Sequence, residues 1–226
     1  MTKRNVLAIG TLAVLGMIAA SPNAPQLPSP AAAGESAPAT AQDVIARMEA
    51  RNAGLQSYTV RVHVRMHTAI PLYNPSLDGT TYYKRPDSFA VVFDRVPGYM
   101  KSFQKLFDDV GDPTGWAADW NARLAGAVQI DGRSLIELVL TKKVYSDQVK
   151  DTLVYVDPNT YELIEMQWRY TNGQAITMTQ SYQDEGGFSL VTHQHVDGNR
   201  RIHATGDADY EVYHTNVAID NAVFAK

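Results

Sequence analysis

The chain contains 226 residues, of which 45% are hydrophobic and 19% charged, as expected for one globular domain and not for a disordered or collagen-like chain. Its formal net charge is −4, and an acidic surface argues against nucleic acid as a partner. The sequence has no cysteine, which excludes a disulfide framework and the acylated cysteine of a lipoprotein.

Residues 1–33 are predicted to form a Sec-type signal peptide. Lys3 and Arg4 make the start basic, residues 6–20 form an apolar stretch too short and too poorly flanked for a spanning helix, and residues 21–33 are rich in proline and small side chains. The mature protein is therefore expected in the periplasm or outside the cell. An uncleaved anchor is the alternative.

The folded domain is expected to span residues 40–226, after a flexible linker over residues 34–39. Small residues before Gly34 permit cleavage at that point, and Ala20 marks an earlier option. Loss of the first 33 residues, which carry two basic and no acidic side chains, takes the formal charge from −4 to −6.

An amphipathic helix is predicted to open the domain over residues 40–56. Thr40 is a suitable N-cap with Asp43 three residues later, and Gly54 lies near the expected end. Its apolar positions follow helical spacing: Val44, Ile45, Met48 and Leu55.

The next segment, "SYTVRVHVRMHT", is predicted to be a strand with one wet face. Arginine and histidine alternate with apolar side chains, and alternation places the two kinds on opposite faces. The apolar set is Tyr58, Val60, Val62, Val64 and Met66, and the polar set is Arg61, His63, Arg65 and His67.

Further strands follow, separated by turn signals. In "YYKRPDSFAVVFD" the basic pair Lys84 and Arg85 and the helix-breaking Pro86 stand before a hydrophobic strand that contains Phe89, Val91 and Phe93. Turns are predicted at "LDGT", "DGR", "DPNT", "TNG", "EGG" and "DGN". Connections this short make the sheet antiparallel.

Residues 97–124 interrupt this pattern with two predicted short helices. Aromatic side chains recur at helical spacing and are the candidates for a lid: Phe103, Phe107, Trp116 and Trp120. The alternative is that they fill one end of the sheet as core.

The predicted fold is α+β, mainly antiparallel β. A sheet of about ten strands tends to curl, so we expect a curved, incompletely closed β-barrel, or half-barrel, whose concave face is covered by helices. Such an arrangement can enclose an apolar space.

The order of these motifs resembles LolA-like outer-membrane lipoprotein-sorting proteins, which are periplasmic carriers of acylated proteins. The matching pieces are the opening helix, "SYTVRVHVRMH", "YYKRPDSFAVVF", "VDPNTYELIEMQW" and "YHTNVAIDNAVF". They span about residues 40 to 224. The stretch from Asp94 to Arg123 and the charged "HQHVDGNRRIHATGDAD" depart from the best-known members.

The resemblance implies a LolA/LolB-like hydrophobic cavity that shelters acyl chains. Its ligands would be acylated lipoproteins or lipids, its candidate partners an inner-membrane release complex and an outer-membrane acceptor, and its state a monomer without cofactor. Proteins of this fold that bind free lipids or glycolipids, or that sense the envelope, are the alternatives. The candidate lining residues are Tyr58, Val60, Val62, Val64, Met66, Phe89, Val91, Phe93, Met166 and Trp168.

Arg85 matches the family arginine that helps to hold the closed, unloaded form, so the resemblance implies that it latches the lid. A guanidinium can donate to several acceptors at once, including backbone carbonyls of a covering helix. The alternative is a surface charge or a plain salt bridge.

Signals for catalysis are weak. The sequence contains no "GxSxG", "HExxH" or phosphate-binding loop, so no catalytic residue is assigned and a non-enzymatic protein is expected. His193 with His195, and His63 with His67, share strand faces. A metal-binding surface module is therefore the rival hypothesis, although no third ligand lies at diagnostic spacing.

Overall fold

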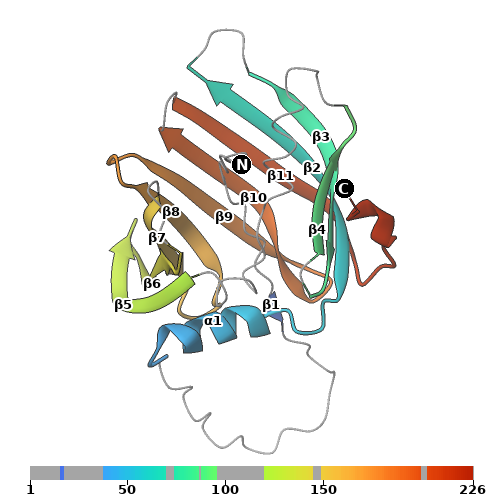
Figure 1. Ribbon diagram of the computed structural model, residues 1–226. Helices are drawn as coiled ribbons and strands as arrows, with labels where there is room; N and C mark the ends of the chain where they lie inside the picture. The colour runs from blue at the N-terminus through green and yellow to red at the C-terminus, as the bar shows by residue number, and fades with distance from the viewer. Residues whose placement is uncertain are drawn as a thin grey trace, which may run out of the picture.

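Ten antiparallel strands form one continuous sheet in the computed structural model, which describes residues 16–17, 38–69, 74–86, 88–95, 120–144, 149–199 and 203–225 (Figure 1). The order across the sheet is β4-β3-β2-β11-β10-β9-β8-β7-β6-β5. The strands are β2 (Ser57–Thr68), β3 (Ser76–Lys84), β4 (Ser88–Phe93), β5 (Trp120–Ile130), β6 (Arg133–Lys142), β7 (Val149–Val156), β8 (Leu163–Tyr170), β9 (Ala175–Glu185), β10 (Phe188–Asn199) and β11 (His203–Thr215). A two-residue strand, β1 (Gly16–Met17), pairs with the start of β10.

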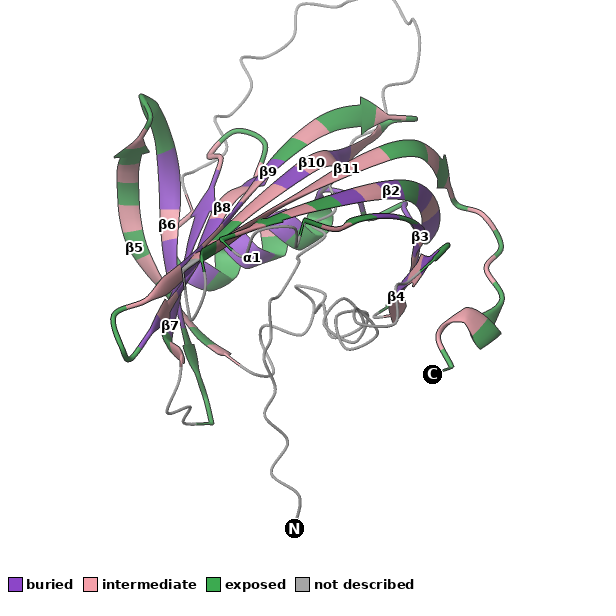
Figure 2. Cartoon of the chain, turned by 90° about the horizontal axis from the view of Figure 1, so that it is seen from above, coloured by how far each residue is buried: buried purple, intermediate pink, exposed green. Residues whose placement is uncertain are grey.

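The sheet is bent into an arc whose two ends, β4 and β5, are not paired with each other in the described chain (Figure 2). Almost every strand pairs with its neighbour in sequence, as expected for strands joined by short turns. The exception joins β2 to β11, which brings the last strand beside the first long one. The predicted half-barrel is confirmed.

The opening helix α1 (Ala41–Ala50) begins as the sequence predicts. The Thr40 hydroxyl accepts from the Asp43 amide at 3.1 Å, and the Asp43 carboxylate accepts from the Thr40 amide at 2.9 Å. This reciprocal pair satisfies donors that have no partner within the helix. The helix ends at Ala50, four residues before the predicted stop at Gly54. Among the described residues, no helix combines the length and apolarity needed to cross a membrane.

Helix α1 packs on the concave side of the sheet, which we call the inner face (Figure 2). Its apolar stripe meets side chains of β6 to β9, so the main core lies between the helix and this half of the sheet. The members of this core are Ala41, Val44, Ile45, Met48, Ile136, Leu138, Leu140, Val154, Val156, Leu163, Met166, Trp168, Tyr170, Ile176 and Met178.

The inner face continues across the other half of the sheet. Gln180 of β9 stands opposite Gln194 of β10, which stands opposite Ala208 of β11, and the same row reaches Val64 and Leu77. Side chains that are directly opposite in paired strands lie on the same face. The predicted alternation of β2 is confirmed, because Tyr58, Val60, Val62 and Val64 are buried and Arg61 and Arg65 are exposed.

Two predicted turns are wrong, because the structure places both inside strands. Residues 77–80 ("LDGT") lie within β3, and residues 197–199 ("DGN") lie within β10. Gly79 has a packing role: a Cβ atom there would lie 2.8 Å from the Val92 carbonyl oxygen and 2.9 Å from Cδ1 of Phe93. Only a residue without a side chain permits that approach.

The predicted second lid helix is also wrong at its end, since Trp120 and Leu124 lie on strand β5 and pack against the main core. A spacing of four residues puts side chains on one face in a helix and also in a strand. Trp120 pairs with Lys142 of β6, so in the structure this segment is a strand and not a helix. The other lid candidates, Phe103, Phe107 and Trp116, lie outside the described residues.

We predict that Gly79→Ala lowers the free energy of unfolding by about 1–3 kcal/mol, because the added methyl must displace backbone and ring atoms that pack against the glycine. Urea unfolding followed by tryptophan fluorescence measures the effect. The control is Gly206→Ala on β11, where an added Cβ would come no closer than 3.8 Å to its nearest neighbour, the Arg65 carbonyl oxygen. Equal changes in the two variants would contradict the steric explanation.

Candidate functional site

Apolar and aromatic side chains cover the inner face beyond the part that α1 occupies. They form two clusters, in which side chains of β2, β3 and β4 meet side chains from the last two strands of the sequence, β10 and β11. The tyrosine cluster contains Leu55, Tyr58, Val60, Tyr83 and Leu190, with Phe89, Phe188, Tyr210 and Tyr213 packed against it. The valine cluster contains Val62, Val64, Leu77, Val91 and Phe93, with Met66, Phe89, Ala208 and Tyr210 packed against it.

Aromatic rings organise the tyrosine cluster. The rings of Tyr58 and Tyr83 stack with centroids 5.2 Å apart, and Tyr213 meets Tyr58 edge-on at 5.4 Å. The Tyr213 hydroxyl donates to the Val191 carbonyl at 2.6 Å. Burial raises the pKa of Tyr213 well above its ordinary value and raises the pKa of Tyr210 as well. Both side chains are therefore neutral at physiological pH, as an apolar surface requires.

The structure brings together the candidate lining residues of β2 and β4, which all belong to these two clusters. Met166 and Trp168 lie elsewhere, in the main core beneath α1. Whether these side chains contact a ligand is a prediction that depends on the function proposed below.

Arg85 lies in the tight turn between β3 and β4, where the sequence places the basic pair before Pro86. Its Nε donates to the Leu55 carbonyl at 2.8 Å and one terminal nitrogen donates to the Asn52 carbonyl at 2.9 Å. Both acceptors belong to the connection that follows α1. The side chain thus ties the end of the helix to the β3–β4 hairpin.

Asn216 secures the same connection from the opposite direction, and the sequence analysis did not identify it. Its Oδ1 accepts from the Gln56 amide at 2.7 Å and its Nδ2 donates to the Gly54 carbonyl at 3.2 Å. The backbone φ of Asn216 is +54°, a left-handed conformation that asparagine adopts more readily than most residues. In the sequence, the only local indication of this residue is the pair Asn216-Val217, directly after the last strand.

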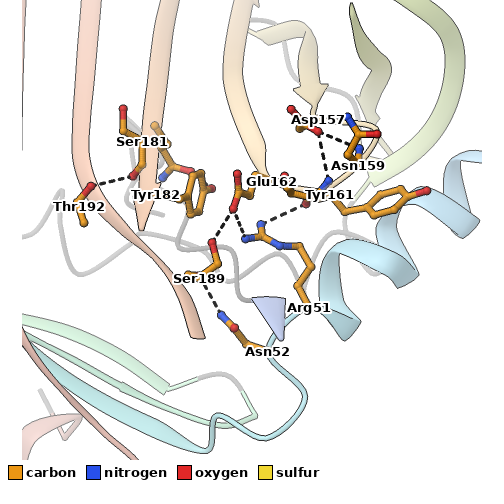
Figure 3. Close-up of polar contacts among 12 residues, drawn as sticks. Arg51, Asn52, Asp157, Asn159, Tyr161, Glu162, Ser181, Tyr182, Ser189 and Thr192 are labelled. Carbon is orange, nitrogen blue, oxygen red and sulfur yellow. Dashed lines mark hydrogen bonds and ion pairs between the residues drawn. The ribbon is translucent and has the colours of Figure 1, made fainter. Parts of the chain in front are cut away.

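A buried polar network lies where α1 ends over the sheet (Figure 3). Arg51, whose side chain is 7% exposed, donates to Glu162 at 3.0 Å, and Ser189 donates to the same carboxylate oxygen at 2.6 Å. The Arg51 guanidinium also lies 5.1 Å above the ring centroid of Tyr182. Burial lowers the pKa of Arg51, with Tyr182 and Glu162 opposing that effect.

The outer face of β2, β3, β10 and β11 carries paired charges, whereas the outer face of β6 and β7 holds a small apolar cluster that includes Leu153 and Tyr155. His63 lies 2.7 Å from Asp78, His193 lies 2.7 Å from Asp209, and His195 lies 2.8 Å from Asp207. The hydrogen bond from His195 lowers the pKa of Asp207. Across the described ranges, no group of three or more histidine, aspartate or glutamate side chains is arranged to hold a metal ion.

Solved structures share this fold at low sequence identity. A LolA superfamily protein from Nitrosomonas europaea has a TM-score of 0.63 and 16% identity, over 84% of this chain and 99% of that chain. A domain from Vibrio parahaemolyticus, described as outer membrane lipoprotein-sorting, has a TM-score of 0.65 and 9% identity, over 81% and 94%. A DUF1329 family protein from Desulfovibrio piger has a TM-score of 0.63 and 14% identity, over 76% and 90%.

No protein-family model and no curated protein matches the sequence. The solved structures establish the fold, which is that of the LolA-like incomplete barrels.

We predict that Glu162→Gln lowers the free energy of unfolding by about 2–3 kcal/mol, because Arg51 would remain buried without its counter-charge. We expect a smaller loss than the roughly 3–5 kcal/mol that breaking a fully buried ion pair costs, because the Glu162 side chain is 18% exposed. Thermal and urea unfolding measure it. Asp94→Asn is the control: it breaks the pair with Arg61, whose partners are 47% and 55% exposed, and should leave stability almost unchanged. A similar loss in both variants would contradict the buried-pair assignment.

Proposed function

We propose that this LolA-like chain is an exported carrier that holds the acyl chains of lipoproteins or lipids against its inner face and delivers them to the outer membrane or cell surface. In this proposal the first 33 residues direct export, the mature protein acts as a monomer in the periplasm or outside the cell, and it binds without catalysing a reaction. An inner-membrane release complex and an outer-membrane acceptor would be its partners.

The observation that carries the proposal is the continuous apolar surface of the valine and tyrosine clusters on an open, curved sheet. Burial of each CH₂ group is worth about 0.8 kcal/mol, so shelter of even part of an acyl chain supplies several kcal/mol. The surface needs no charged group to bind such a chain. Thr81, opposite Val60 and Val91, is a small neutral polar side chain within this surface.

Affinity is limited by the fact that these side chains are already buried. Val60, Val62 and Val64 are at most 5% exposed, so an incoming chain exchanges existing apolar contacts for new ones. A carrier must release its load, and such an exchange lowers net affinity without removing the binding surface. Phe103, Phe107, Trp116 and Trp120 remain the proposed lid residues, with Trp120 acting from the edge strand β5.

Arg85 would control access in this mechanism. Its two hydrogen bonds join the connection after α1 to the β3–β4 hairpin, so movement of the helix end away from β2 and β3 requires both bonds to break. Bonds from a charged donor are worth about 1.5–3 kcal/mol each. That is enough to bias a closed form and small enough for a bound acyl chain to offset.

We predict that the purified mature protein binds a hydrophobic fluorescent probe saturably, and that a long-chain lipid or an acylated peptide displaces it. Affinity should depend little on salt, because apolar burial and not charge supplies the free energy. A fluorescence titration with displacement measures both. An unrelated acidic globular protein of similar size is the control, and an indistinguishable titration would contradict the carrier proposal.

We predict that Arg85→Leu changes the rate of acyl-cargo uptake and release severalfold while the protein remains folded. The substitution keeps apolar bulk but removes the donors that serve the Asn52 and Leu55 carbonyls, at a cost to the closed form of about 1–3 kcal/mol for each carbonyl left without a partner. Transfer of a fluorescent acylated peptide between vesicles measures the rate.

Lys84→Leu is the matched control for the latch. Lys84 is the neighbouring residue, and its Nζ donates to Oδ1 of Asn221 in an exposed contact. Its loss should alter transfer little. Equal transfer rates for the wild type and Arg85→Leu would contradict the latch, and the two hydrogen bonds of Arg85 would then serve only to stabilise the fold.

A further inference from the structure

The buried inner face contains a pair of glutamines, in addition to the smaller polar side chains Thr81 and Thr152. Gln180 of β9 and Gln194 of β10 are directly opposite each other, and their side chains are 5% and 4% exposed. The next opposite pair on the same face is Met178, a member of the main core, and Val196, which packs against that core. The amide pair therefore sits between the core beneath α1 and the valine cluster that Ala208 joins on the next strand.

A chain of contacts fixes the orientation of both amides. The Arg51 guanidinium lies over the Tyr182 ring, and the Tyr182 hydroxyl donates to Oε1 of Gln180 at 2.7 Å. Because this oxygen is engaged, the amide nitrogen of Gln180 points the other way, and it donates to Oε1 of Gln194 at 3.2 Å. Oε1 of Gln194 is engaged by that bond, so its amide nitrogen, Nε2, points away from Gln180 and is the last group in this series of contacts.

Nε2 of Gln194 carries two N–H donors, and within the described part of the chain the structure gives them no protein acceptor. The atom keeps some contact with solvent, since the fully buried side-chain atoms without a partner in these ranges are Asn52 Oδ1 and Thr152 Oγ1. Because the residue as a whole is only 4% exposed, few water molecules can serve these donors, and such an amide gains from an acceptor that reaches it. Here the donors are preorganised, since each preceding group in the chain holds the next one in place. A group that brings an acceptor to this position gains a hydrogen bond without the cost of ordering the glutamine.

We propose that Gln194 is a binding residue for the carbonyl group of an acyl chain, whether the carbonyl belongs to an ester or to an amide. This inference rests on the proposed carrier function and names the chemistry that the site selects. A carbonyl is a neutral acceptor joined directly to an apolar chain, which matches a neutral donor at the border of an apolar surface. An anionic head group fits less well, because the nearby cation of Arg51 is already paired with Glu162.

The test compares ligands that differ only at the carbonyl. A long-chain diacylglycerol is measured against the dialkyl ether of the same chain length, by displacement of the hydrophobic probe. The wild-type protein should bind the ester about fivefold to tenfold more tightly, the value of one hydrogen bond. In Gln194→Met, which keeps the volume but removes the donors, the ratio of ester to ether affinity should fall to about one.

A second ligand pair separates the two sources of the carbonyl. A hexadecanoyl amide of a short neutral peptide, as in an acylated protein, is measured against the hexadecyl ether of a matching head group. A larger ratio for the ester pair assigns the site to free lipids, and a larger ratio for the amide pair assigns it to acylated proteins. Either result supports the proposal.

Two further variants test the orienting chain. Tyr182→Phe removes the hydroxyl that holds Gln180, so the affinity ratio should fall to an intermediate value if Tyr182 is a positioning residue. Gln167→Met is the control, because Gln167 lies on the outer face of β8, where it donates to Thr177, and it should keep the wild-type ratio. Urea unfolding checks that each variant is folded.

The outcomes separate this inference from the proposed function. Equal affinity of the wild-type protein for ester and ether would overturn the carbonyl site, with the donors of Gln194 then serving a water molecule only, and would leave the carrier function standing. A ratio that persists in Gln194→Met would also overturn it. Failure of every acyl ligand to displace the probe would instead contradict the carrier function.

Discussion

The short connection after α1 is the part of the molecule on which the arrangement of helix and sheet depends. Residues 52–56 join α1 to β2, and their backbone groups are bonded by distant side chains: Arg85 serves the Asn52 and Leu55 carbonyls and Asn216 serves Gln56 and Gly54. Buried backbone polar groups must find partners. Because these partners come from the β3–β4 hairpin and the chain after β11, the helix is fixed to both.

The two faces of the sheet have separate physical tasks. The inner face collects the core, the aromatic clusters and the amide pair, whereas the outer face pairs Arg65 with Asp209 and histidines with aspartates across β2, β3, β10 and β11. Alternation along each strand makes this separation possible without any additional layer. Exposed pairs add little stability, but they give this part of the outer face a polar surface.

Local signals in the sequence were sufficient for the elements, and long-range contacts decided the rest. Thr40 and Asp43 fixed the start of α1, and the alternation in β2 was unambiguous. Gly79 and Trp120 were misassigned, because a glycine required by close packing resembles a turn signal and a spacing of four suits both kinds of element. The role of Asn216 was not predicted, although its segment was among the pieces that matched the family, since its partner Gln56 lies 160 residues away in the chain.

The open edges of the sheet give the protein a mechanical property that a closed barrel lacks. In a closed barrel the number of strands and their stagger fix the radius, but here β4 and β5 end the strand order without meeting. Small rotations between neighbouring strands, each within the ordinary range of sheet twist, therefore add up to a wider or narrower arc with every ladder hydrogen bond kept. An open sheet can therefore change its curvature, whereas the radius of a closed barrel is fixed by its strand number and stagger.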